Sequence, residues 1–403
     1  MISVSDSVRL IRENTPPTGP GRTPLDRCLG RVLREPVLAP TDLPRTDRAT
    51  MDGFAVRADD SGREWRAVRT ARTDDSGVTD LSPGEAVRVS TGTALLCRHP
   101  VRVLPVECVR REDDRIVAET LPGPAYVHRR GADARAGDSL IVPGAPVTPG
   151  ALALLASLGM DSVLATRPLR ILHYTTGDEI LAPGEAARDG GIFDSNGPLI
   201  AGLLGALGEA ATRRHLREDY SGALATVRGD LEEHAPDLLL VSGGAGPGSG
   251  DFTEKLLGDL GYAVLIRGGV NVRPGKPLLL GVREGGVAFG LPGNPLSHWA
   301  SFHTFVLPAI ARLRGEGDRV REIRATLEGD PGDLSDARPT NHPARLFWEN
   351  GTARVRLHPW SASGNVRVLA DSNAMVHIAP GSPAPRPGDL VTARLFPTSC
   401  NLL

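Results

Sequence analysis

Three loops in the second half of the chain carry residue types that bind an anion. The first, residues 242–251, follows a short apolar run and precedes a helical pattern, so its glycines would leave backbone N–H groups free at a helix N-terminus. The second, residues 272–277, places an arginine and a lysine three positions apart on a turn. The third, residues 289–297, is a strand and a tight turn before a long helical pattern. One glycine-rich turn is often only a turn, but three of them within about sixty residues predict one polyanion pocket.

The second loop supplies the two cations best suited to a tetrahedral oxyanion. Arg273 offers a planar fork of donors and Lys276 a point charge, and the hydroxyl of Ser297 would complement both if it does not simply cap its helix. Lysine occurs only at Lys255 and Lys276, which makes a lysine inside a turn motif harder to explain as a generic surface charge. The alternative is two solvated cations on a turn. Other substrate-binding candidates in these loops are Ser242, Gly243, Gly244 and Asn294.

Three carboxylates near the same strand ends are candidate metal ligands. Asp178 and Glu179 follow an apolar strand directly, and Asp251 precedes a helical pattern. Carboxylates beside a phosphate indicate a bridging divalent cation, because the bare charges would repel the anion. The alternatives are acidic residues that complement a helix dipole and, for Asp251, a helix N-cap.

A fourth carboxylate, Asp52, stands next to Gly53 in a region of short β-like runs. An aspartate beside a glycine is common in turns, where its side chain bonds the backbone. The other interpretation is a carboxylate held at the edge of a strand for chemistry. The sequence alone leaves both open.

The elements that must position these residues form an α/β multidomain protein. Strands alternate with helices over 167–315, which predicts a central, mostly parallel sheet with helices on both faces and ligands at the carboxyl ends of its strands. Regularly spaced β-like runs predict a small β-rich domain over 46–140 and a second β domain over 316–403. Residues 1–45 and 141–166 are predicted to form an extended, partly helical linker domain. Residues 1–45 hold too few apolar side chains for a core, so they must pack on a later segment or on another subunit.

Several individual elements can be predicted from the pattern. Residues 278–289 indicate a hairpin, and residues 297–313 the longest helix. In the C-terminal β domain, residues 353–357, 366–369 and 390–393 are expected to be strands.

Composition excludes several classes of function. A formal net charge of −2 gives no support for a nucleic-acid partner. The four cysteines lack the spacing of a zinc site or a disulfide framework. The sequence begins without a basic and apolar leader, and no apolar run approaches the length of a membrane span, so we expect a cytoplasmic protein that does not enter a membrane.

Several of these segments also resemble the MoeA family of molybdopterin molybdenumtransferases, which includes the E domain of gephyrin. The resemblance runs over nearly the whole chain, and its motifs occur in the same order as in the family. The most specific motifs are Pro-Gly-Lys-Pro and Leu-Pro-Gly-Asn-Pro-x-Ser. The segments that carry it are Met51–Ala55, Arg130–Asp133, Asp178–Ile180, Asp194–Asn196, Ser242–Gly244, Pro274–Pro277, Leu291–Ser297, Arg345 and Ser363–Gly364.

The resemblance implies a transferase that inserts molybdate into adenylylated molybdopterin, with Mg²⁺ as cofactor, and releases AMP and molybdenum cofactor. The implied molybdate ligands are Arg273, Lys276, Ser297, Arg345 and Ser363. The implied Mg²⁺ ligands are Asp178, Glu179 and Asp251, and the implied catalytic carboxylates are Asp52, Asp133, Glu179 and Asp251. It also implies a homodimer whose site is shared between subunits, which would explain the undersized N-terminal segment.

Two loops depart from the family pattern. After Ser90-Thr91-Gly92 the chain continues as Thr93–Pro100 and lacks the Gly-Ala-Asp of the family. The first anion loop has Gly246 where the family has a serine, and the loss of a phosphate-facing hydroxyl would cost roughly 1 kcal/mol or more of binding. The alternative function is therefore a divergent, non-catalytic pterin-binding or scaffold protein of the same family. A third possibility, the preceding adenylylation step, uses the same α/β domain but does not explain the resemblance of both β domains.

Overall fold

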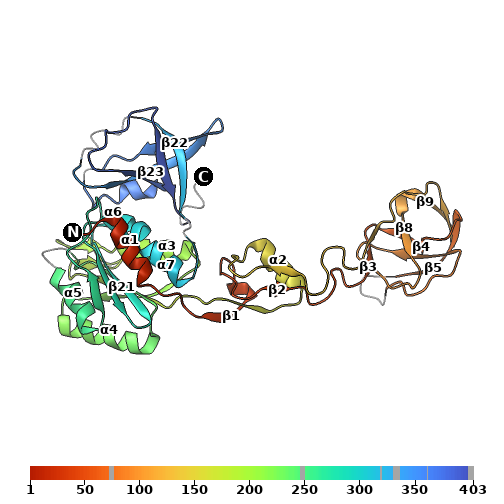
Figure 1. Ribbon diagram of the computed structural model, residues 1–403, viewed down its shortest axis with the longest axis horizontal. Helices are drawn as coiled ribbons and strands as arrows, with labels where there is room; N and C mark the ends of the chain where they lie inside the picture. Colours follow the sequence, from red (N-terminus) through yellow and green to blue (C-terminus); the bar gives the residue numbers. More distant parts are fainter. Residues whose placement is uncertain (72–76, 246–249, 318–319, 330–335, 361, 398–403) are drawn as a thin grey trace. The chain divides into compact units, whose positions relative to one another are not determined.

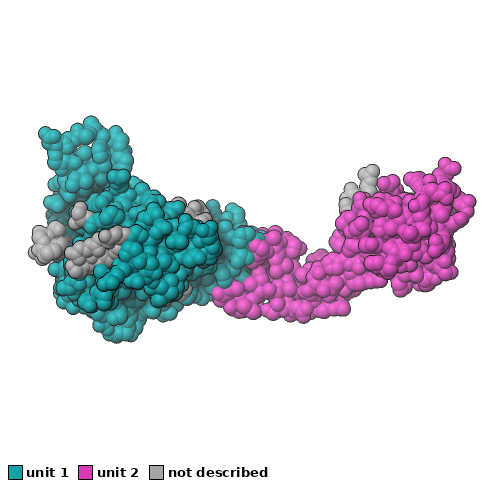
Figure 2. Space-filling view, turned by 90° about the horizontal axis from the view of Figure 1, so that it is seen from above, with its two compact units in different colours: residues 1–34, 146–149, 162–403 teal, residues 35–145, 150–161 magenta. Residues whose placement is uncertain are grey.

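The computed structural model of this chain is a multidomain α/β protein with several sheets, as the sequence predicts at that level. The structure describes residues 1–71, 77–245, 250–317, 320–329, 336–360 and 362–397, without the side chains of Gly250 and Asp251. The chain divides into two compact units, coloured separately in Figure 2: residues 1–34, 146–149 and 162–403, and residues 35–145 and 150–161. The four domain ranges expected from the sequence remain a prediction. In the described ranges, no helix is both long enough and apolar enough to cross a bilayer.

A six-stranded mixed sheet forms the centre of the first unit. Its strand order is β17-β14-β18-β21-β20-β19. The first four strands are parallel, and β20 runs antiparallel to both of its neighbours, β21 and β19. The strands are β14 (Ile171–Thr176), β17 (Ala211–Leu216), β18 (Leu238–Ser242), β19 (Ala263–Ile266), β20 (Leu279–Arg283) and β21 (Gly286–Leu291). The antiparallel pair β20–β21 confirms the expected hairpin.

Helices cover both faces of this sheet because its central strands are apolar on both sides; all five residues of β18 are buried. Figure 1 shows α4 (Tyr220–His234) and α5 (Gly250–Asp259) on one face. The other face carries α3 (Asn196–Ala206) and α6 (Pro295–Ser301), which continues through a π-helical turn into α7 (Leu307–Leu313). Residues 297–313 are therefore helical, as expected.

The N-terminal helix α1 (Val4–Glu13) packs on α7 of the same chain. Its Ile11 is fully buried in the main core of the first unit. For this helix the required partner is thus a later segment, the first of the two possibilities that the sequence left open. Strand β1 (Pro20–Pro24) likewise pairs with β13 (Ser162–Thr166).

The order of the strands determines where a ligand site forms. From β14 the chain passes to β17 on one side and then to β18 on the other, so the connections diverge between β14 and β18. In open α/β sheets a crevice forms at such a point, outside the carboxyl ends of the strands. The loops after Thr176 and Ser242 border this crevice.

The C-terminal part of the first unit is a closed five-stranded barrel. Its strands are β22 (Arg321–Leu327), β23 (Thr340–Glu349), β24 (Thr352–Leu357), β25 (Ala374–Ile378) and β26 (Leu390–Leu395). The predicted strand at residues 366–369 is wrong, because Arg367–Ala370 is a 3₁₀-helix. Its alternating valines suggested a strand, but Val368 is the buried residue and packs into the main core, while Val366 is exposed.

The second unit is built mainly of β-strands. Its largest sheet has the order β8-β4-β6-β5-β10-β9, with β4 (Gly53–Arg57), β5 (Glu64–Thr70), β6 (Glu85–Val89), β8 (Val101–Pro105), β9 (Val109–Glu112) and β10 (Arg115–Ala118). Smaller sheets join β3 (Asp47–Ala49) to β7 (Ala94–Leu95) and β11 (Val127–His128), and β2 (Val37–Leu38) to β12 (Ser139–Ile141). Most of α2 (Pro149–Ser157) belongs to this unit.

Candidate functional site

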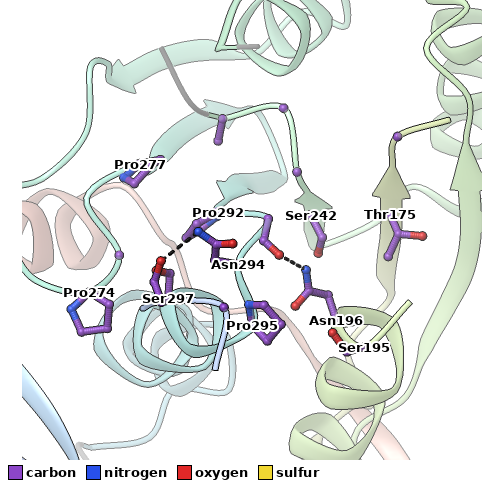
Figure 3. Close-up of a pocket in the computed structure, with 18 of the residues that line it drawn as sticks. Thr175, Ser195, Asn196, Ser242, Pro274, Pro277, Pro292, Asn294, Pro295 and Ser297 are labelled. Atoms are coloured by element: carbon purple, nitrogen blue, oxygen red, sulfur yellow. Dashed lines mark hydrogen bonds between the residues drawn. The ribbon is translucent and has the colours of Figure 1, made fainter. Parts of the chain in front are cut away.

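A cavity of about 1000 Å³ opens at the crevice between β14 and β18. Figure 3 shows Thr175 and Ser242 at the ends of these neighbouring strands, with Asn294 and Ser297 beside them. The cavity collects nine of the residues singled out from the sequence. They are Glu179, Ser242, Gly243, Gly244, Arg273, Lys276, Asn294, Ser297 and Ser363.

The glycine loop after β18 lines one side of the cavity. Gly243 has a φ of +100°, and a Cβ there would lie 2.6 Å from Thr176 Oγ1, so this position requires glycine. The N–H of Gly243 donates to Leu291 O at 3.0 Å. By contrast, the N–H groups of Gly244 and Ala245 have no acceptor among the described residues, and they are available to an anion.

The cation loop faces the same cavity. Arg273 Nη1 donates to Asp336 Oδ2 at 2.9 Å, and the Arg273 guanidinium lies 4.7 Å from the ring centre of Trp360. The exposed Lys276 lines the cavity and forms no ion pair with any residue that the structure describes. Between them, Gly275 has a φ of +98°, and a Cβ there would lie 2.6 Å from Ser301 Oγ. The turn therefore requires glycine to carry both cations.

The C-terminal part of the unit completes the wall. Asn294 Nδ2 donates to Ser363 Oγ at 2.8 Å, one of the contacts drawn in Figure 3, and the Leu296 N–H donates to Ser363 O at 3.1 Å. Arg338, which the sequence reasoning missed, also lines the cavity, whereas Arg345 is not among its lining residues and pairs with Asp371 at 3.3 Å.

The predicted metal ligands are placed differently from one another. Glu179 lines the cavity together with Glu218, which the sequence reasoning missed. Asp178 lines a neighbouring cavity of about 900 Å³, and its Oδ1 accepts the Glu218 N–H at 3.2 Å. The side chain of Asp251 lies outside the described residues, although its backbone is the second position of α5. Carboxylate oxygens at the mouth of an anion pocket suit Mg²⁺, so Glu179 fits the expected ion and the full ligand set stays a prediction.

One further group of described side chains is close enough to hold a metal: Asp230, Glu233 and His234 on α4. Asp230 already has partners, because it accepts the Tyr174 hydroxyl at 2.5 Å and pairs with Arg214 at 3.1 Å. These contacts give the carboxylate a structural role without an ion.

Two buried histidines contact Ser242, one of the residues that line the cavity, and His173 also lines the neighbouring cavity of about 900 Å³. His173 and His298 both place Nε2 near Ser242 Oγ, at 2.6 and 3.3 Å. Burial lowers the pKa of His173 to about 3 and that of His298 to about 4, so both rings are neutral at pH 7. The sequence reasoning missed both, because a histidine in an apolar strand or helix carries no motif.

The two predicted catalytic carboxylates of the second unit are both exposed. Asp52 Oδ1 accepts the Thr91 N–H at 2.6 Å and the Thr91 hydroxyl at 2.9 Å, and these hydrogen bonds hold the pKa of Asp52 below its ordinary value. Asp133 Oδ1 lies 2.9 Å from His128 Nε2. Their catalytic roles remain predictions.

Comparison with known proteins gives two family matches. Residues 2–159 match the MoeA N-terminal region (domain I and II), and residues 173–312 match a probable molybdopterin binding domain. Both matches agree with the resemblance found in the sequence.

Individual relatives cover most of the chain. A molybdopterin molybdenumtransferase of Haemophilus influenzae is 30% identical over 302 residues, which are 72% of each chain. One of Staphylococcus aureus is 28% identical over 369 residues, 89% of this chain and 87% of the relative. The crystal structure of a molybdopterin biosynthesis MoeA protein from Pyrococcus horikoshii is similar with a TM-score of 0.77, at 26% identity, over 98% of this chain and 99% of that one. The chain therefore belongs to the molybdopterin molybdenumtransferase family, the MoeA proteins.

Proposed function

We propose that this chain inserts molybdate into adenylylated molybdopterin and releases AMP, giving molybdenum cofactor. The observation that carries the proposal is one cavity that is lined by both a glycine loop and three cations, Arg273, Lys276 and Arg338. A doubly charged oxyanion and a nucleotide phosphate each need donors of this kind. The names of the relatives, molybdopterin molybdenumtransferases, support this choice of anions.

Molybdate is proposed to bind between the cation loop and the C-terminal wall. Arg273 and Arg338 supply planar donor forks, Lys276 a mobile point charge, and Ser297 and Ser363 hydroxyl groups. Arg273 is held on two sides, by Asp336 and by the Trp360 ring, so little entropy is lost when it engages an anion.

The adenylyl phosphate is proposed to bind the free N–H groups of Gly244 and Ala245. Glu179 faces the same space, and with Asp178 and Asp251 it is the proposed ligand set for Mg²⁺. When bound, Mg²⁺ would neutralise charge on the phosphate that leaves with AMP.

Asp52 and Asp133 are proposed to reach the cavity of a partner copy in a homodimer. The resemblance to the family supports this assembly, and an obligate interface would bury of order 2,000 Å² or more. Light scattering should give a dimer at micromolar concentration. A monomer there would remove both carboxylates from the proposed site unless the two units of one chain meet.

The decisive experiment is anaerobic incubation with adenylylated molybdopterin, Mg²⁺ and molybdate, with AMP release followed by chromatography. AMP that appears only with molybdate supports the proposal. Lys276→Ala should reduce this release. Lys255→Ala is the matched control, since Lys255 on α5 lies 4.1 Å from the ring centre of Tyr220 on α4 and does not line the cavity. Pterin binding without AMP release would instead favour the non-catalytic scaffold, which the altered glycine loop permits.

A further inference from the structure

The hydroxyl of Ser242 is bonded beneath the cavity and is not free to face a ligand. Its Oγ lies 2.6 Å from His173 Nε2 on β14 and 3.3 Å from His298 Nε2 on α6. All three residues are buried, with exposed fractions of 3%, 1% and 0% for Ser242, His173 and His298. Figure 3 shows Ser242 at the very end of its strand, where the glycine loop begins.

The contacts of His298 determine where the protons lie. His298 Nδ1 is 2.9 Å from Pro292 O, and a carbonyl only accepts, so Nδ1 carries the proton. A neutral His298 then has a lone pair on Nε2, which accepts the Ser242 hydroxyl. Since the Ser242 hydroxyl hydrogen is donated to His298, Ser242 Oγ can only accept a hydrogen bond from His173. His173 must therefore carry its proton on Nε2. This assignment leaves His173 Nδ1 as the one acceptor of the three side chains with no partner in the described residues.

The resulting chain of hydrogen bonds runs from β14 through the first residue of the glycine loop to the turn at Pro292. The two loops that border the cavity are thus tied together below its floor, in addition to the Gly243 N–H that donates to Leu291 O at 3.0 Å. The turn is also held from the other side, since Asn196 Nδ2 donates to Gly293 O at 2.6 Å.

We infer that His173 and His298 are positioning residues, which set the spacing between the glycine loop and the Pro292–Asn294 turn through the hydroxyl of Ser242. The inference rests on the proposed function, because that spacing matters only if one anionic ligand contacts both loops. Ser242 is accordingly a link between the loops and not a direct phosphate ligand. In this role the two histidines act through Ser242 and need no contact with substrate or metal.

Burial keeps both rings neutral, and the charged groups around them act in opposite directions. Arg213 on β17 faces His173 and disfavours its protonation, as does His298 itself. Asp194, just before α3, favours the protonated form of His298, but burial outweighs it. A protonated His298 would carry a hydrogen on Nε2 and could no longer accept from Ser242, so the link exists only in the neutral form.

Nitrogen NMR of the histidine side chains in the full chain tests the assignment without any activity. We expect His298 as the Nδ1–H tautomer and His173 as the Nε2–H tautomer, neither titrating above pH 5. Ser242→Ala should shift the Nε2 resonances of both rings, whose centres are 6.4 Å apart. Either ring titrating between pH 6 and 7, or Ser242→Ala leaving both resonances in place, would overturn the inference.

Steady-state AMP release then tests the positioning role. His298→Asn keeps an amide donor for Pro292 O but loses the acceptor for Ser242, so we expect the KM for the pterin nucleotide to rise about tenfold, with a smaller change in kcat. His303→Asn is the matched control. His303 is also a buried histidine, its Nδ1 lies 2.9 Å from Trp299 O, and it does not line the cavity. His298→Gln, which can place an oxygen near the Nε2 position, should restore part of the affinity.

Equal KM values for His298→Asn and His303→Asn would refute the positioning role. The two proposals fail separately. A wild-type chain that releases no AMP refutes the proposed reaction, while the tautomers and their response to Ser242→Ala still decide whether the link exists. If His298→Asn does not fold, Ser242→Ala replaces it in the KM comparison, since it cuts the same link from the other side.

Discussion

Asp336 Oδ2 lies 2.9 Å from Arg273 Nη1, and the same carboxylate also holds Arg338. Arg338 donates its backbone N–H and its Nε to Asp336 Oδ1, at 2.9 and 3.1 Å. These contacts, those with Arg338 above all, hold the pKa of Asp336 at about 2, so it is ionised at any working pH. One carboxylate thus orients two guanidinium groups that line the cavity, although it is not itself among the lining residues.

We predict that Asp336→Asn raises the molybdate concentration needed for half-maximal AMP release by about threefold to tenfold. This corresponds to a loss of roughly 1 kcal/mol in the binding free energy of molybdate, because the two arginines are oriented less firmly. The amide keeps one acceptor, so the two arginines stay in place but are held less firmly. The measurement is AMP release against molybdate concentration. Asp371→Asn, which loosens Arg345 outside the cavity, is the control and should match the wild type.

Arg338 and Arg345 offer a direct comparison between structure and sequence. The resemblance to the family implies Arg345 as a molybdate ligand, whereas Arg338 is the arginine of this segment that lines the cavity. Arg338→Ala should therefore raise the molybdate requirement about tenfold or more, and Arg345→Ala should leave it unchanged. Titration of molybdate against both variants decides this, and the reverse order of effects would show that the oxyanion site is misplaced.

The lowered pKa values of the buried histidines determine how the free energy of unfolding should depend on pH. Burial lowers the pKa of His173 and His303 to about 3 and that of His298 and His342 to about 4, from an ordinary value of 6.5. Between pH 6.5 and 4 the unfolded chain binds more protons than the folded one, so the free energy of unfolding falls as the pH falls. Each histidine adds a slope of up to about 1.4 kcal/mol per pH unit in that window.

Urea unfolding at several pH values measures this slope. His303→Phe removes one of the four groups and should lower the slope by about one histidine's share. A stability that does not change between pH 6.5 and 4 would mean that these rings take up protons while folded.

A buried ion pair joins the N-terminal segment to the core of the first unit. Arg31 donates to Glu209, which also lies 3.7 Å from Arg314 and accepts the Leu169 N–H at 3.0 Å. The side chains of Arg31 and Glu209 are 5% and 0% exposed. Breaking a buried pair from one side leaves an uncompensated charge, which costs about 3 kcal/mol or more.

Glu209→Gln should therefore lower the free energy of unfolding by about 3 kcal/mol, with AMP release per folded molecule unchanged. Arg314 keeps Glu316 at 2.7 Å, so the loss comes mainly from Arg31. Glu322→Gln, which removes an exposed partner of Arg394, serves as the control in the same urea titration and should not change stability.

The residues of the site that could be predicted from sequence are those in loops with unusual local chemistry. Gly243 and Gly275 were recognisable because their backbone conformations require glycine, and Lys276 because it stands in a turn between prolines. Strands were recognisable where apolar side chains fill both faces, as in β18. Strand β17 was missed because it is an edge strand with exposed arginines, which give no apolar pattern.

The parts that could not be predicted depend on which distant residues meet. Arg338 and Asp336 belong to a segment without a motif, and they reach the cation loop because Arg273 pairs with Thr340 at the start of β23. His173 and His298 are 125 positions apart, and only the sheet order and the placement of α6 bring them to Ser242. No local pattern carries that information.

A single substitution at Asp52 distinguishes the two interpretations of this residue, a turn residue or a catalytic carboxylate. Its Oδ1 accepts both Thr91 hydrogen bonds, and the amide oxygen of an asparagine can accept the same two. Asp52→Asn should therefore fold and melt like the wild type. A carboxylate that binds Mg²⁺ or positions the attacking group cannot be replaced by an amide, so we expect turnover to fall by roughly 10²-fold or more.

The control is Asp60→Asn in the same unit. Asp60 accepts the Gly84 N–H at 2.7 Å and the Trp65 Nε1–H at 3.0 Å through a single oxygen, Oδ2, and the Gly62 N–H through the other. An amide has only one oxygen for these three donors, so Asp60→Asn should lower the melting temperature while each folded molecule keeps its turnover. Opposite outcomes in the two variants, a normal melt with lost turnover at Asp52 and a lowered melt with normal turnover at Asp60, would assign Asp52 to the chemistry. Normal turnover in Asp52→Asn would leave it a turn residue bonded to Thr91.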